Sequence, residues 1–81
     1  MTTTTPVDPR ALVAQGVSLR NAVVAALDSR GHTMASWCRA TGYEQSYLSR
    51  MLAGTGRYAE LRSALCRALD LDREWLDEQL G

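Results

Sequence analysis

Glycine closes three successive helical segments of this chain, and this spacing limits what the chain can fold into. Gly31, Gly42 and Gly54 each follow a segment whose apolar residues recur every three or four positions. That period lines one face of an α-helix, and a glycine just past the last apolar turn is a common helix end. No segment shows the period of two that a half-buried strand requires. The sequence therefore predicts an all-α fold of short helices.

Capping residues mark where these helices begin. Ser18, Thr33 and Asp72 each precede an apolar helical segment, as helix-capping residues do. Asp8 followed by Pro9 favours one further short helix, because proline suits the first helical position. We predict a flexible N-terminal tail over residues 1–16, which carries this short helix, and one domain of five helices over residues 17–81. With their caps, the predicted helices run over residues 9–15, 18–31, 33–40, 44–53, 58–69 and 72–81.

A chain of 81 residues forms one domain, and a domain of this size is often stabilised further by oligomerisation.

The charges of this chain balance overall but are unevenly distributed. Residues 1–67 hold eight arginines against four acidic residues, whereas residues 68–81 hold one arginine against five. A basic body with an acidic end can present one face to phosphate and repel phosphate elsewhere.

Several classes of function lack their characteristic residues in this sequence. Cys38 and Cys66 lie far apart and are accompanied only by His32, so a metal site lacks ligands and two buried thiols are expected. No apolar run reaches the ~18 residues of a membrane span, and no signal-peptide pattern is visible, so we expect a cytoplasmic protein without membrane contact. Because no acid–base or nucleophile–base pair is visible either, we expect no enzyme, no cofactor and no small-molecule ligand.

Residues 31–54, GHTMASWCRATGYEQSYLSRMLAG, place a tight glycine turn between two short predicted helices, the sequence shape of a helix-turn-helix. This segment resembles, without a gap, the helix-turn-helix of the lambda-repressor-like (Cro and XRE-type) transcription regulators. The resemblance continues through residues 67–76, which look like the family's fourth and fifth helices, and the chain has the size of the small phage regulators of the Ner and Cro type. The positions that carry it are Thr33, Trp37, Cys38, Gly42, Tyr43, Gln45, Ser46, Leu48, Ser49, Arg50, Met51 and Gly54.

The resemblance implies a compact five-helix DNA-binding domain whose second and third helices form the helix-turn-helix. Three residues depart from the family pattern. Met34 stands where many members have a glutamine that contacts a phosphate, and Thr41 stands at a position that is usually larger and apolar. Glu44 begins the predicted recognition helix, where it can accept a hydrogen bond from a cytosine amino group or repel the DNA.

Helix geometry supports a DNA-reading face independently of the resemblance. With Leu48 at the centre of the buried side, 100° per residue places Ser46 and Arg50 on the opposite side. Small side chains allow close approach to the major groove, and arginine can bind guanine O6 and N7 through two hydrogen bonds, as glutamine can bind adenine. An intramolecular ion pair of Arg50 with Glu44, or with an acidic residue elsewhere, is the alternative. The predicted base-contacting residues are Gln45, Ser46, Tyr47, Ser49 and Arg50.

Further residues are expected to contact DNA phosphates or a second subunit. The phosphate candidates are the Thr33 hydroxyl and the backbone N–H at the start of the second helix, Arg57 and the N-terminus of the fourth helix, and Arg39. Tyr58 is a further candidate, although it can instead pack on the domain. The last helix offers apolar surface for a homodimer, which would place two recognition helices about 34 Å apart. The predicted dimer residues are Trp75, Leu76 and Leu80. In the alternatives, Trp75 closes the monomer core, or residues 1–16 form the dimer contact or a DNA-binding arm.

We expect a dimeric repressor that binds an inverted repeat of double-stranded DNA in a bacterial or phage promoter, its own promoter included. Two alternatives remain at this point. One is the antitoxin of a toxin–antitoxin pair. The other is a protein-interaction module that has lost DNA binding, which the neutral net charge, Met34 and Glu44 favour.

Overall fold

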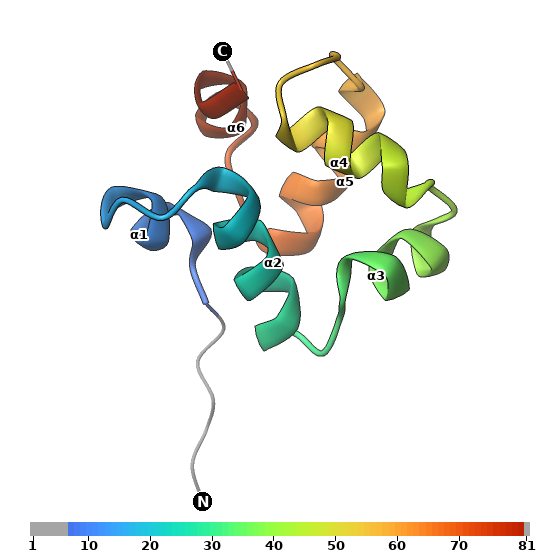
Figure 1. Cartoon of the computed structure of the whole chain (residues 1–81), viewed down its shortest axis with the longest axis horizontal. Helices are drawn as coiled ribbons and strands as arrows, with labels where there is room; N and C mark the ends of the chain where they lie inside the picture. Colours follow the sequence, from blue (N-terminus) through green and yellow to red (C-terminus); the bar gives the residue numbers. More distant parts are fainter. Residues whose placement is uncertain (1–6, 81) are drawn as a thin grey trace, which may run out of the picture.

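Six helices and no strands form residues 7–80, the part of the chain that the computed structural model describes (Figure 1). The all-α prediction is confirmed: five helices lie within the predicted domain, and the sixth is the short helix predicted over residues 9–15. Within these residues, no helix has the length and apolar content needed to span a bilayer. The helices are α1 (Pro9–Ala14), α2 (Leu19–Ser29), α3 (Met34–Thr41), α4 (Gln45–Leu52), α5 (Ala59–Leu69) and α6 (Arg73–Leu80).

Side-chain caps fix the beginnings of the first three helices, as the sequence predicts. Asp8 Oδ1 accepts from the N–H of Arg10 at 3.0 Å, and Ser18 Oγ accepts from the N–H of Asn21 at 3.3 Å. Thr33 Oγ1 accepts from the Ser36 N–H at 3.0 Å, and Ser36 Oγ accepts in return from the Thr33 N–H at 2.8 Å. A cap of this kind contributes about 1 kcal/mol, enough to decide where a short helix starts.

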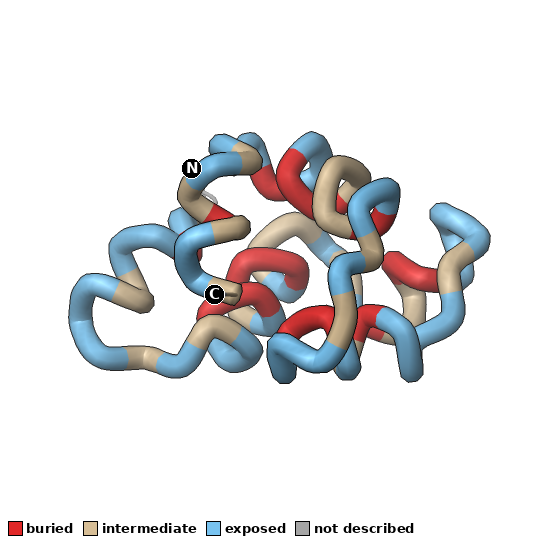
Figure 2. Tube along the Cα trace, turned by 90° about the horizontal axis from the view of Figure 1, so that it is seen from above, coloured by how far each residue is buried: buried red, intermediate tan, exposed pale blue. Residues whose placement is uncertain are grey.

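The apolar faces of the helices meet in one core. In Figure 2 most of the buried stretches, drawn in red, lie toward the middle of the molecule. Trp37 is only 4% exposed, which makes it a core residue. Cys38 and Cys66 are buried and unpaired, as expected, and burial raises the pKa of both thiols. The largest side chains with almost no exposure are Val23, Leu27, Leu48, Met51, Leu65, Leu69 and Leu76.

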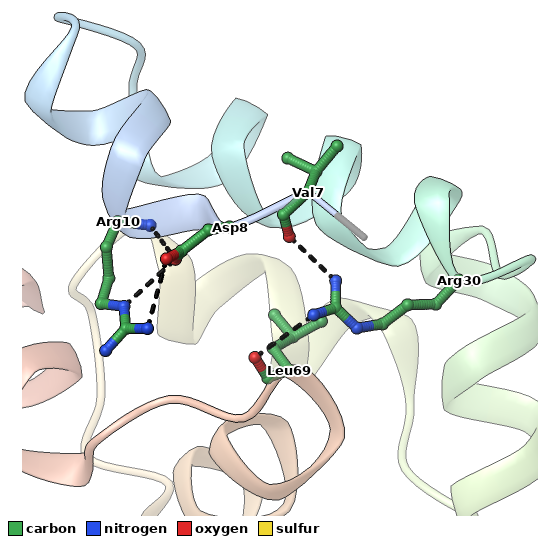
Figure 3. A network of polar contacts seen from close by, with 5 residues as sticks. All are labelled: Val7, Asp8, Arg10, Arg30 and Leu69. Carbon is green, nitrogen blue, oxygen red and sulfur yellow. Dashed lines mark hydrogen bonds and ion pairs between the residues drawn. The ribbon is translucent and has the colours of Figure 1, made fainter. Parts of the chain in front are cut away.

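Residues 7–16 are packed into the folded unit, which corrects the predicted flexible tail over this stretch. The N–H of Val7 donates to Ser29 Oγ at 2.9 Å, and Pro9 is buried. Arg30 Nη1 donates to the carbonyls of Val7 at 3.0 Å and Ala26 at 2.9 Å, and its Nη2 donates to the Leu69 carbonyl at 3.5 Å (Figure 3). The guanidinium of Arg30 thus joins the N-terminal segment to α2 and α5. Residues 1–6 of the predicted tail lie outside the described residues.

The last helix packs on α5 and closes the core. Leu76 is fully buried within its own chain, so its prediction as a dimer contact is wrong. Trp75 and Leu80 are half-buried, pack against the same core, and keep part of their surface accessible. Asp77 Oδ1 accepts from Arg62 Nη1 at 2.9 Å and from Arg73 Nε at 3.1 Å, which ties α6 to α5.

We expect Asp77 to make the stability of the fold depend on acid pH. Hydrogen bonds from Arg62 and then Arg73 hold the pKa of Asp77 below its usual value of 3.8. A folded-state pKa below the unfolded one stabilises the protein above the unfolded pKa, and this contribution is lost as pH falls from about 4 through the lowered folded-state pKa. Urea midpoints measured from pH 7 to pH 2 should therefore fall less steeply below pH 4 for Asp77→Asn than for the parent chain. Parallel curves would contradict this role, and the effect is modest because the carboxylate is half-exposed.

Candidate nucleic-acid interface

A short turn over residues 42–44 joins α3 to α4 and fixes how the second helix lies on the first. Gly42 ends α3 in the left-handed conformation, φ 84°, which glycine adopts without strain. The N–H groups of Gly42 and Tyr43 both donate to the Cys38 carbonyl, at 2.8 and 3.0 Å. The ring of Tyr43 stacks on Trp37 with 6.3 Å between the centroids. The turn is therefore anchored to the core at both of these residues.

The buried side of α4 sets which of its residues face outward. Leu48, Met51 and Leu52 are buried against the core, which fixes the rotation of the helix about its axis. Of the five predicted base-contacting residues, Ser46 and Arg50 consequently lie opposite Leu48 on the open side of α4, with Tyr47 and Ser49 on its flanks. Gln45 is the first residue of the helix and lies at its N-terminal end. Ser49 is half-buried at the edge of this surface, whereas the remaining four are exposed: Gln45, Ser46, Tyr47 and Arg50.

The guanidinium of Arg50 is free to bind a ligand. Within residues 7–80 it makes no hydrogen bond and no ion pair, so the alternative of an ion pair with Glu44 is not found. The backbone carbonyl of Arg50 accepts from the N–H groups of Ala53 at 3.2 Å and Thr55 at 3.0 Å, and from Thr55 Oγ1 at 2.9 Å. The loop that follows α4 is thereby held to its C-terminal end.

Glu44 places a carboxylate at the start of α4. It occupies the N-cap position but its side chain caps no backbone N–H. Instead, Glu44 Oε2 accepts a long hydrogen bond from Ser46 Oγ, at 3.4 Å. The carboxylate is exposed and can accept from a donor in front of the helix, such as an amino group on a base edge.

The arginines of the chain divide into two sets. Within the described residues, Arg10, Arg30, Arg62 and Arg73 bind groups of their own chain. No hydrogen bond or ion pair of the side chain is found there for the other set: Arg20, Arg39, Arg50, Arg57 and Arg67. The phosphate candidates Arg39 and Arg57 belong to this second set and are exposed, so their charges are available to an anion.

Thr33 keeps only part of its predicted phosphate-binding capacity. Its own backbone N–H donates to Ser36 Oγ within the capping box, so this N–H is not available to a phosphate. Its hydroxyl oxygen accepts from the N–H of Ser36, but the hydroxyl proton remains available to a phosphate oxygen. Thr33 is exposed at the start of α3.

Tyrosine side chains gather beside this surface, a feature that the sequence analysis did not find. The rings of Tyr47 and Tyr58 stack with centroids 5.7 Å apart and an interplanar angle of 24°. Tyr58 has a left-handed backbone, φ 41°, and a side chain at Gly56 would collide with its ring. Tyr58 thus packs on the domain, the second of its two predicted roles. With Tyr43, these rings line a notch of about 350 Å³.

No family model, no curated protein and no solved structure matches this chain. Among residues 7–80, no three histidine, cysteine, aspartate or glutamate side chains are grouped so that they could hold a metal ion.

Proposed function

We propose that this chain is a sequence-specific, double-stranded DNA-binding transcription regulator of the lambda-repressor-like type. In this proposal α3 and α4 form the helix-turn-helix, and the exposed side of α4 enters the major groove. The observation that carries the proposal is the open side of α4, where the short side chains of Ser46 and Ser49 accompany the guanidinium of Arg50, which has no partner among residues 7–80. A groove-reading helix requires this combination, because small residues allow close approach and arginine supplies paired donors for guanine.

The surroundings of α4 support the same proposal. Arg39 lies on the neighbouring helix α3 and Arg57 lies in the loop after α4. Both are exposed, and neither side chain has a hydrogen-bond or ion-pair partner in the described part of the chain. Arginines on either side of a reading helix can contact phosphates and hold the helix in register on the duplex. Thr33 adds a hydroxyl donor at the start of α3. The regulator acts as a dimer on an inverted repeat, with the accessible parts of Trp75 and Leu80 in the subunit contact, and represses by blocking the polymerase.

Selection of bound duplexes from a random DNA library tests this proposal with the full chain. We expect enrichment of an inverted repeat whose half-sites lie about 10 base pairs apart, because a symmetric dimer presents its two reading helices at that spacing. Binding should be measured at low and at moderate salt, since the phosphate contribution falls as salt rises. A chain that enriches no sequence and binds no duplex at low salt would contradict the proposal.

A protein-interaction module is the second candidate, and one observation favours it. The notch beside α4 is mainly apolar and carries Tyr47, which is 42% exposed. Exposed aromatic side chains of this kind are typical of protein-binding surfaces. Glu44 at the start of α4 also disfavours contact with a polyanion. Failure to bind any duplex at low salt, together with line broadening of the Tyr47 and Tyr58 resonances on adding a partner protein, would favour this candidate.

A further inference from the structure

A hollow of about 650 Å³ lies between the loop after α4, the first turns of α5, and α6. Arg57, Arg62 and Arg73 line it together with one carboxylate, that of Asp77. The ionised groups of this hollow therefore sum to +2, whereas the whole chain is neutral. A concentration of positive charge in a concave surface attracts anions more strongly than the same charges spread over a convex surface.

Asp77 holds two of the three guanidiniums in place. Its Oδ1 accepts from Arg62 Nη1 at 2.9 Å and from Arg73 Nε at 3.1 Å. Arg62 Nη2 also donates to the Gly56 carbonyl at 3.2 Å, and Arg73 Nη1 donates to Ser63 Oγ at 2.6 Å. Because these side chains are already ordered, an anion that binds them loses little affinity to the freezing of side-chain motion.

The hollow has more donors than acceptors. A guanidinium carries five N–H donors and no acceptor. Arg57 uses none of its donors within the described residues, and Arg73, whose side chain is 38% exposed, leaves Nη2 free. Arg62 Nε is buried and has no acceptor within the described residues. The free N–H groups of Arg57 and Arg73 can donate to the oxygens of an oxyanion.

We propose that the Arg57–Arg73 hollow binds a phosphate group. The oxygens of a phosphate point in several directions, so one phosphate can accept from Arg57 and from Arg73 at the same time, and arginine matches its geometry well. The loop that carries Arg57 is bound to the Arg50 carbonyl through Thr55, so the hollow adjoins the C-terminal end of α4. The phosphate is a backbone phosphate of the DNA strand beside α4, and this identification of its source rests on the proposed function.

Titration with inorganic phosphate tests the hollow without DNA. In ¹⁵N-labelled full-length protein at constant ionic strength, the Nε–H resonances of Arg57 and Arg73 should shift and saturate, whereas that of Arg20 should not. Arg20 is the control because it is an exposed, unpaired arginine on α2 that does not line the hollow. Arg57→Gln should abolish the shift of Arg73. Equal, unsaturated shifts of all three arginines would overturn the proposal.

A salt series with the selected duplex tests the DNA source. Arg57→Gln and Arg73→Gln should each weaken binding about tenfold on any sequence, and should reduce the slope of log K against log salt by about one. Arg20→Gln should change neither the affinity nor the salt slope. Arg73→Lys keeps the positive charge and should therefore show most of the salt slope of the parent chain. Urea unfolding of each variant checks the fold, and Arg57→Gln removes no hydrogen bond or ion pair that is found within residues 7–80.

The two experiments separate the inference from the proposed function. If the parent chain binds duplex but the Arg57 and Arg73 variants behave like Arg20→Gln, the phosphate site is overturned while the proposed function stands. In the other outcome, the chain binds no duplex, but inorganic phosphate still shifts the Nε–H resonances of Arg57 and Arg73. The phosphate site then stands with free phosphate as its ligand, whereas the proposed function and the assignment of the ligand to a DNA phosphate are both overturned.

Discussion

Replacing Arg50 with alanine is expected to reduce affinity for the selected duplex by about ten- to hundredfold, and affinity for an unrelated duplex much less. A guanidinium that binds guanine O6 and N7 discriminates against a wrong base by about 1–3 kcal/mol. In the free protein this guanidinium has no partner among the described residues, so the substitution removes no intramolecular bond. The fold should therefore be unchanged, and titrations of both duplexes at one salt concentration measure the loss directly.

Two further variants make the Arg50 result interpretable. Arg50→Lys keeps the charge but not the paired donors, so it should recover non-specific binding and only part of the specificity. Arg20→Ala removes an unpaired arginine from α2 and should leave both affinities nearly unchanged. An equal loss on both duplexes would identify Arg50 as a phosphate contact, and no loss on either would remove α4 from the interface.

The features that the sequence predicts well depend on residues close together in the chain. The caps at Ser18 and Thr33 form within one helical turn, so residue type and spacing are sufficient to find them. The outward face of α4 follows in the same way, because 100° per residue and a buried Leu48 determine which side chains lie opposite. For this reason the helices and the candidate reading face could both be predicted without the tertiary structure.

The features that the sequence analysis missed depend on residues far apart in the chain. Arg30 bonds to Val7 and to Leu69, and nothing in the helical pattern indicates that these three segments meet. The stack of Tyr47 on Tyr58 requires a left-handed backbone at Tyr58, a conformation that is rare for a tyrosine and has no sequence signal here. The arginine-lined hollow was not predicted either, because its residues come from a loop and two helices that lie apart in the sequence.

The misassignment of Leu76 has the same physical origin. An apolar position on an amphipathic helix shows that the side chain avoids water, but not whether its own chain or a second subunit covers it. In α6 the three apolar residues divide, since Leu76 is fully buried while Trp75 and Leu80 remain half-buried. The stability of variants in this helix can therefore separate a core role from a dimer role.

Leu76→Ala is expected to lower the free energy of unfolding by about 2–5 kcal/mol, the usual effect of replacing a fully buried leucine. Small domains have total stabilities of about 5–15 kcal/mol, so a large share of the stability of this chain would be lost. Leu80→Ala is the matched control, because it removes the same side chain from a half-buried position of the same helix. Its effect on unfolding at low protein concentration should be clearly smaller.

The dependence on protein concentration distinguishes the two roles of α6. We expect Leu76→Ala to lower the free energy of urea unfolding by the same amount at a low and at a high protein concentration, because the contacts of Leu76 lie within one chain. If the accessible surface of Leu80 joins two subunits, Leu80→Ala should instead lose most at the high concentration, where association stabilises the fold. A Leu76→Ala variant whose loss appears only at high concentration would place Leu76 between subunits and contradict its burial in the core.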